Sequence, residues 1–163
     1  MSLLIARATL DDVAEADVLI RETAEWLIRK GEPLWGPNET SREELRRVAS
    51  LGELVIGRID GELASCMYLH DEDRMFWPHV VPGEAFYIHR LAVARKFAGR
   101  GYAHAMLEWG ANEARAKGRP FLRLDCEPRA KLLALYREAG YSRIDFAPIQ
   151  VGEHFVVRHE RRV

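Results

Sequence analysis

A cluster of glycines and cations in the middle of the chain has the composition of a phosphate-binding turn. Arg95, Lys96, Gly99, Arg100 and Gly101 follow one another within seven positions. Glycine lets the backbone approach a ligand closely, and the first N–H groups of a helix have no acceptor inside the helix. A phosphate satisfies these groups. The turn therefore predicts phosphate binding, and the alternative is an ordinary strand-to-helix turn with surface arginines.

The segments on either side of this turn predict a strand before it and an amphipathic helix after it. Residues 87–93 are mostly aromatic, aliphatic or β-branched, as in a buried strand. From Tyr102 apolar residues recur at helical spacing up to Lys117. Gly118 ends the helix, and Pro120 prevents it from resuming.

This whole segment resembles a known signature. Leu91-Ala92-Val93 followed by residues 98–103, AGRGYA, is similar to the acetyl-coenzyme A signature Gln/Arg-x-x-Gly-x-Gly/Ala of the GNAT superfamily of N-acetyltransferases. Gly101 and Ala103 match its last two fixed positions, whereas Ala98 stands where the family has Gln or Arg, a role that Arg95 or Lys96 could take. The resemblance implies acetyl-coenzyme A as co-substrate, and its binding residues are Leu91, Ala92, Val93, Ala98, Gly99, Arg100, Gly101, Tyr102 and Ala103.

A second resemblance concerns residues 135–141, LYREAGY, which are similar to the family's Leu-Tyr-Glu-Lys-x-Gly-Phe segment. It implies that Tyr136 is the general acid that protonates the coenzyme A sulfur, because a tyrosine hydroxyl can donate to a developing thiolate. The alternative is a core tyrosine on an amphipathic helix. Seven residues earlier the family often has a coenzyme-contacting asparagine, and Arg129 takes that position here.

The base that deprotonates the amine is less clearly marked in the sequence. Many relatives carry a glutamate on the strand before the phosphate turn, and Tyr87 occupies its position here. Glu84 and His89 are the nearby alternatives, and an imidazole exchanges protons near neutral pH. A structural role for His89, or a water chain without a dedicated base, stays open. Tyr87 is assigned to the acceptor site together with Trp35, whose loop lines the acceptor pocket in the family.

The remaining segments predict one domain, residues 1–163, in the order β-α-α-β-β-β-α-β-α-β-β. The class is α/β (α+β): a GNAT-like mixed, mostly antiparallel sheet with helices on both faces. Outside the central segment, the expected elements are a strand 4–8, helices 10–30 and 41–49, a hairpin 53–59 and 62–69 joined by Asp60-Gly61, a strand 121–126 parallel to 87–93, a helix 129–139, and strands 141–146 and 154–158. Thr9 with Asp12 is expected to cap the first helix, Thr40 or Ser41 to cap the second, and Gly140 to end the last.

The composition excludes several classes of protein. Of 163 residues 48% are hydrophobic and the net charge is −1, which disfavours a general nucleic-acid or membrane-surface binder. No apolar run approaches the roughly 20 residues of a membrane span, and the N-terminus does not resemble a signal peptide. Cys66 and Cys126 predict reduced thiols and a cytoplasmic location; Cys126 is expected to be a small buried hydrophobe rather than a nucleophile.

Two functions follow. The first is an N-acetyltransferase that acts on a primary amine of a small molecule or peptide in a ternary complex, with homodimers common among similar proteins. The second is a catalytically silent acyl-coenzyme A-binding module for regulation or interaction, suggested by Ala98, Arg129 and the absent strand glutamate. No metal is predicted, because the histidines show no ligand spacing with cysteines or carboxylates. A nucleotide-phosphate enzyme is disfavoured because no Gly-Lys-Ser/Thr ending is present.

Overall fold

The chain divides into two compact units. The computed structural model describes residues 2–163. The first unit comprises Met1–Tyr68 and Arg90–Met106, and the second comprises Leu69–His89 and Leu107–Val163. Strand β4 (Ala85–Val93) begins in the second unit and ends in the first, whereas helix α3 (Tyr102–Ala116) begins in the first and ends in the second.

Three antiparallel strands form the sheet of the first unit. β1 (Leu4–Arg7) pairs with β2 (Leu54–Ile59), which pairs with β3 (Glu62–His70). Asp60 and Gly61 join β2 to β3 with φ angles of 50° and 84°, the left-handed conformations that a two-residue hairpin turn requires. The predicted hairpin is thereby confirmed, since Asp-Gly adopts these angles at little expense.

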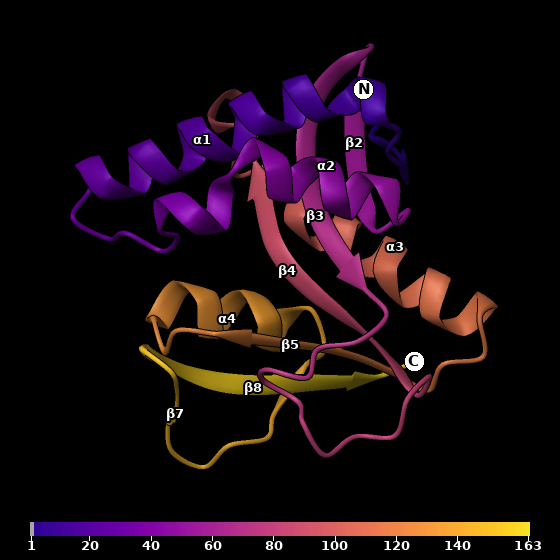
Figure 1. Cartoon of the computed structure of the whole chain (residues 1–163), viewed down its shortest axis with the longest axis vertical. Helices are drawn as coiled ribbons and strands as arrows, with labels where there is room; N and C mark the ends of the chain where they lie inside the picture. Colours follow the sequence, from indigo (N-terminus) through magenta and orange to yellow (C-terminus); the bar gives the residue numbers. More distant parts are fainter. Residues whose placement is uncertain (1) are drawn as a thin grey trace. The chain divides into compact units, whose positions relative to one another are not determined.

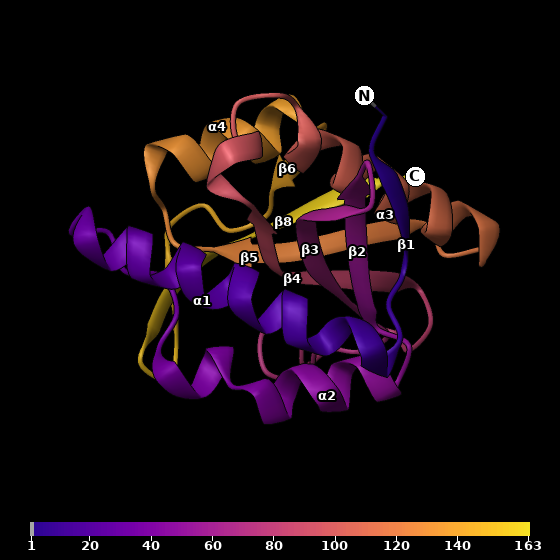
Figure 2. The ribbon, with the colours of Figure 1, turned by 90° about the horizontal axis from the view of Figure 1, so that it is seen from above.

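Two helices cover one face of β2 and β3. α1 (Val13–Arg29) follows a 3₁₀ turn, Leu10–Asp12, and α2 (Arg42–Ser50) follows another, Pro37–Thr40. Figures 1 and 2 both show α1 running beside α2. Their apolar stripes bury a common core against the sheet, and its members are Val13, Ala16, Leu19, Ile20, Leu45, Val48, Leu54, Ile56, Cys66 and Tyr68.

Local sequence signals set the starts of these helices. The Thr9 side chain accepts from the Asp11 N–H, and the Asp12 carboxylate accepts from the Thr9 N–H at 2.8 Å, which completes the predicted capping box. The Ser41 hydroxyl accepts from the Glu44 N–H at 3.2 Å and caps α2. Both predicted caps are therefore confirmed.

The sheet of the second unit is mixed. Residues 85–88 of β4 pair in parallel with β5 (Phe121–Cys126), and β5 pairs antiparallel with β8 (His154–Arg162), beside which it lies in Figure 1. Two short strands, β6 (Ser142–Arg143) and β7 (Ile149–Val151), also pair antiparallel with β8. The parallel β4–β5 pair is the one that the connecting helix α3 requires.

Glycines end the two helices of the C-terminal half as expected. α3 stops at Ala116, and Gly118 follows with a φ of 66°. α4 (Ala130–Glu138) is followed by Gly140 with a φ of 86°. Both glycines occupy the left-handed position that follows a helix and that a side chain disfavours.

The C-terminal strand pair differs from the prediction. Residues 141–146 were expected to form one strand, but only Ser142–Arg143 does, and β7 is an additional short strand. The reason lies at Asp145, whose carboxylate accepts the Arg158 backbone N–H at 2.8 Å and the Arg158 guanidinium at 2.8 Å. A side chain thus takes the hydrogen bond that a strand partner would otherwise make.

Asp145 is expected to contribute to stability in a pH-dependent way. Burial raises its pKa, but the hydrogen bonds and charge of Arg158 lower it more, so the folded pKa lies below the usual value. The contribution is therefore present above the unfolded pKa of about 3.9 and is lost as pH falls through the folded pKa. Asp145→Asn should lower the free energy of unfolding by about 1–2 kcal/mol at neutral pH and by much less in acid. Urea unfolding from about pH 7 down to pH 3 would test this, and an equal loss at every pH would contradict it.

The predicted class is confirmed: a mixed, mostly antiparallel sheet combined with four α-helices among residues 2–163. The expectation of one domain over residues 1–163 stays a prediction. Within the described part of the chain, no helix has both the length and the apolar character that a membrane span requires.

Candidate active site

The glycine-rich turn lies in the first unit, directly before α3. A 3₁₀ turn, Arg95–Phe97, leads from β4 into Ala98, and Gly99 and Gly101 follow with φ angles of 75° and 80°. A Cβ placed on either glycine would meet no other heavy atom within 4 Å, so the backbone faces open space there. The Ala105 N–H donates to the Gly101 carbonyl, so earlier N–H groups of this turn have no acceptor inside α3. This geometry fits a bound phosphate.

The three cations of the turn have different surroundings. The Arg95 guanidinium lies 3.6 Å from the centre of the Trp26 ring, and Lys96 forms an ion pair with Glu62. Arg100 is exposed and lies 5.9 Å from the Phe97 ring. All three raise the local positive potential. The idea that Arg95 or Lys96 replaces the missing first side chain of the signature stays a prediction.

Trp35 lies next to an unusual backbone position. Its half-buried ring packs against the core of the first unit, 5.8 Å from the Arg90 guanidinium. Arg90 also donates to the Glu39 carbonyl at 3.1 Å and to its carboxylate at 2.8 Å. The φ of Arg90 is 52°, which is strained for a non-glycine residue and disrupts the regular course of β4 just before Leu91. Such outliers cluster at functional sites.

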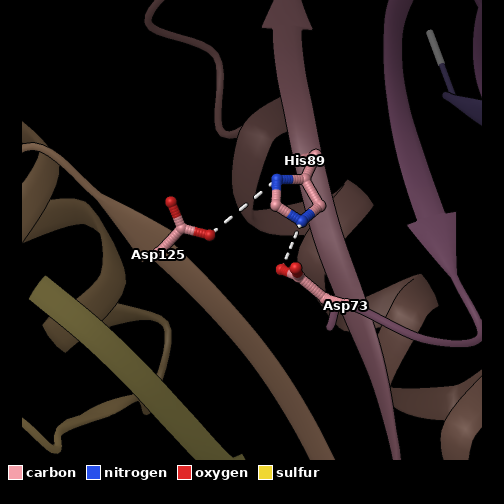
Figure 3. Close-up of side chains that lie close together, drawn as sticks. All are labelled: Asp73, His89 and Asp125. Carbon is pink, nitrogen blue, oxygen red and sulfur yellow. Dashed lines mark hydrogen bonds and ion pairs between the residues drawn. The ribbon is translucent and has the colours of Figure 1, made fainter. Parts of the chain in front are cut away.

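His89 stands between two carboxylates in the second unit (Figure 3). Its Nε2 lies 2.9 Å from Asp73 Oδ2, and its Nδ1 lies 3.9 Å from Asp125 Oδ1. All three side chains are largely buried: His89 is 17% exposed, Asp73 is 7% exposed and Asp125 is 9% exposed. Burial raises the pKa of Asp73, but the His89 hydrogen bond and charge lower it more, so that the net pKa is below its usual value. Asp73 is therefore an ionised acceptor at neutral pH.

The other two predicted residues of β4 and its approach, Glu84 and Tyr87, belong to a different network. Both contact Arg123, which is 5% exposed: Glu84 through an ion pair of 2.7 Å and the Tyr87 hydroxyl by accepting at 3.2 Å. Arg123 also pairs with Glu160 at 2.6 Å. The Tyr87 ring packs on Trp77 in a core of the second unit. Both residues therefore help to hold Arg123 inside the second unit.

Tyr136 is buried in the second unit, on α4. Its ring packs edge-on against Tyr141, with 5.9 Å between ring centres, and 5.8 Å from His159. Burial, with the neighbouring Cys126 and Asp125, raises its pKa well above the usual value. The hydroxyl is therefore protonated at neutral pH, as a hydrogen-bond donor to a thiolate must be. Arg129 precedes α4 and pairs with Glu127 at 2.7 Å.

The cysteines have the surroundings of inert thiols. Cys66 and Cys126 are both free and buried. Burial raises the pKa of each to about 12, so neither is a thiolate at neutral pH. This agrees with the expectation that Cys126 fills space rather than attacks substrate.

The predicted site residues thus fall into two groups. Leu91, Ala92, Val93, the turn 98–103 and Trp35 lie in the first unit, whereas Glu84, Tyr87, His89, Arg129 and Tyr136 lie in the second. Asp73 and Asp125, the partners of His89, were not predicted from the sequence. Asp125 shares a strand face with Arg123, so its polarity within a buried strand was an available signal. Asp73, in a loop, offered none.

Asp73, His89 and Asp125 are also a set of metal-ligand types. One ligand atom from each lies within 4.8 Å of those of the other two. The two nitrogens of His89 face different carboxylates (Figure 3), and a single ion could take only one of these nitrogens as a ligand. The expectation that the protein uses no metal stays a prediction.

Comparisons with known proteins identify the family. Residues 20–141 match the profile of the acetyltransferase (GNAT) family. The uncharacterized N-acetyltransferase YesJ of Bacillus subtilis (strain 168) is 30% identical, with 82% of this chain and 78% of that protein covered. The chain belongs to the acetyltransferase (GNAT) family and is an acyltransferase.

Solved structures share the fold. A GNAT-family acetyltransferase from Listeria monocytogenes has a TM-score of 0.84 at 22% identity, covering 99% of this chain and 95% of that one. The PaiA N-acetyltransferase of Thermoplasma acidophilum, in complex with coenzyme A, has a TM-score of 0.77 at 15% identity, covering 100% of both chains. The fold predicted from the resemblance is therefore confirmed.

Proposed function

We propose that the protein transfers the acetyl group of acetyl-coenzyme A to a primary amine of a small molecule or peptide, by direct attack in a ternary complex. The observation that carries the proposal is the open turn at Gly99 and Gly101, whose two left-handed glycines precede α3 in a member of the GNAT family. A relative with this fold binds coenzyme A.

The first unit supplies the residues that hold the co-substrate. The N–H groups of residues 98–103 bind the pyrophosphate, and the exposed Arg100 attracts it. Leu91, Ala92 and Val93 offer backbone groups to the pantetheine arm, an assignment supported by the bend at Arg90. Arg129, which belongs to the second unit, is proposed as a further cation for the phosphates. Acetyl-coenzyme A supplies an acyl group that is activated as a thioester.

The second unit supplies the groups that move protons. His89 accepts the proton that the amine must lose before it attacks, and Tyr136 donates to the departing sulfur. We favour His89 over Glu84 as the base, because the Glu84 carboxylate is paired with a buried arginine. A base must be able to contact the amine, and the Glu84 carboxylate is already bound by the Arg123 guanidinium at 2.7 Å.

Trp35 and Tyr87 are the proposed acceptor residues. Trp35 is the stronger assignment, because its ring is half-exposed whereas Tyr87 is 2% exposed. A half-exposed aromatic ring offers an apolar wall to an acceptor that carries an apolar part.

We also propose a cytoplasmic protein that uses no metal and can form a homodimer. Two free, buried cysteines suit a reducing compartment, and the proposed proton transfers need side chains alone. A net charge of −1 offers no electrostatic attraction to nucleic acid or to a membrane surface.

The test combines calorimetric titration with acetyl-coenzyme A and an assay of thiol release with a panel of primary amines. We expect binding and turnover, and Tyr136→Phe should lower kcat by about 100-fold or more because the general acid is lost. Tyr141→Phe is the matched control: this neighbouring tyrosine is also buried, and its hydroxyl has no hydrogen-bond partner within residues 2–163. Binding without thiol release from any amine would instead favour a catalytically silent module.

A further inference from the structure

We propose that Asp73, His89 and Asp125 form a proton-accepting triad, in which Asp73 fixes the tautomer of His89 and Asp125 stabilises the imidazolium that forms. The inference rests on the proposed function and deepens it, since it assigns positioning residues to the base. Neither carboxylate belongs to the signature segments of the sequence.

The Asp73 side chain is oriented by hydrogen bonds of its own turn as well as by His89. Its Oδ1 accepts the Phe76 N–H at 3.1 Å, and its carbonyl accepts the Trp77 N–H at 2.9 Å, so a turn of the backbone orients the carboxylate. Oδ2 then faces His89 Nε2 at 2.9 Å. An ionised carboxylate only accepts, so Nε2 must carry the hydrogen. The lone pair of His89 is therefore on Nδ1.

Asp125 lies on the Nδ1 side of the same ring (Figure 3). The distance of 3.9 Å from its Oδ1 to Nδ1 is too long for a hydrogen bond, so Nδ1 keeps its lone pair for a proton from the substrate. The same distance is short enough for a strong electrostatic attraction between Asp125 and the ring once the ring carries a positive charge. The register Ile88↔Leu124 places His89 and Asp125 on neighbouring strands at the same level.

Other groups around the ring affect its charge as well. The His70 ring lies 5.4 Å away between centres, and the Phe76 ring lies 6.1 Å away. Arg158, itself paired with Asp145 at 2.8 Å, interacts electrostatically with Asp125. Two carboxylates thus face His89 directly, and Arg158 interacts with one of them, Asp125.

The proton step balances with these groups alone. The ammonium form of the acceptor, R–NH₃⁺, loses one proton to the Nδ1 lone pair of His89, giving R–NH₂ and an imidazolium. The imidazolium then carries hydrogens on both nitrogens, one toward Asp73 and one toward Asp125. The free amine then forms the amide as the carbon–sulfur bond breaks. Tyr136 protonates the departing sulfur, the second amine proton replaces the one that Tyr136 gave, and His89 returns its own proton to water.

The tautomer can be measured without substrate. In the protein labelled with ¹⁵N-histidine, long-range NMR correlations should show His89 as the Nε2–H tautomer, because Nε2 faces the Asp73 carboxylate at 2.9 Å. In Asp73→Asn the Nδ1–H form should rise, because an amide can donate to Nε2 as well as accept from it. Glu72→Gln, a neighbouring exposed acid paired with Arg74, should change nothing. An Nδ1–H tautomer in the unmodified protein would overturn the proposal.

Kinetics separate the triad from the proposed function. With an amine that the unmodified protein acetylates, Asp73→Asn and Asp125→Asn should each lower kcat/KM about 10-fold or more and move its acidic limb to lower pH. The imidazolium is less stable without the neighbouring negative charge. Unchanged pH profiles in both variants would overturn the triad alone, whereas no thiol release from the unmodified protein would overturn the proposed function as well. Calorimetric binding of Zn²⁺ that His89→Gln removes would make the cluster a metal site and overturn the triad.

Discussion

Replacing Gly99 and Gly101 together by aspartate is expected to weaken acetyl-coenzyme A binding by at least about 100-fold, or nearly 3 kcal/mol. Two effects add. The new carboxylates place negative charge where we propose that the phosphates bind, which opposes the attraction of the N–H groups and Arg100. The Cβ atoms also strain a backbone whose φ angles are 75° and 80° and extend into the open space before α3. Calorimetric titration of both proteins with acetyl-coenzyme A measures the difference.

A matched control separates the site from general strain. Gly52 also has a positive φ, 71°, and a Cβ there would meet no heavy atom within 4 Å. Gly52→Asp therefore introduces the same substitution into a similar backbone away from the turn, and its affinity should be within about twofold of the unmodified value. If the double variant bound acetyl-coenzyme A normally, the turn before α3 would be only a turn, and the proposed function would lose its main support.

The second large effect concerns stability. Arg123→Leu should lower the free energy of unfolding by about 2–4 kcal/mol, because removal of one partner of a buried ion pair leaves the others uncompensated. Arg123 is 5% exposed. It forms ion pairs with Glu84 and Glu160 and donates a hydrogen bond to the Tyr87 hydroxyl. The two glutamate side chains are about a quarter exposed, so water can partly replace the arginine, which keeps the loss below that of a fully buried pair.

Urea unfolding with Arg162→Leu as control would test this prediction. Arg162 also lies over the Phe121 ring, at the same 5.0 Å as Arg123, but it is exposed. Its replacement should change stability by no more than about 0.5 kcal/mol. A triple variant that adds Glu84→Gln and Glu160→Gln to Arg123→Leu should recover part of the loss, because no carboxylate is then left unpaired. Equal losses for Arg123→Leu and Arg162→Leu would contradict the network.

Local signals in the sequence predicted local structure well. The Asp60-Gly61 turn, the capping box of Thr9 with Asp12 and the glycine after α3 all appear where they were expected. Each depends on backbone angles and hydrogen bonds within a few residues, so the chain segment itself carries the information. The glycine-rich turn belongs to the same category: its two positive φ angles follow from residues that adopt them readily.

Contacts between distant segments could not be predicted in this way. The strand expected at residues 141–146 stops early because Asp145 binds Arg158, thirteen residues further on. Nothing in the sequence around Glu84 indicated that Arg123, on β5, pairs with its carboxylate. In both places a side chain found a partner that no periodicity or spacing marks.

His89 shows most clearly the difference between what the sequence predicts and what only the tertiary structure decides. The sequence by itself determined most of the helix and strand order, the glycine-rich turn before α3 and a histidine on the strand before that turn, because residue type and spacing govern local backbone structure. Only the tertiary structure decided that Asp73 and Asp125 face the two nitrogens of that histidine. The three residues come from a loop and two strands, and the pairing of β4 with β5 sets which side chains lie side by side.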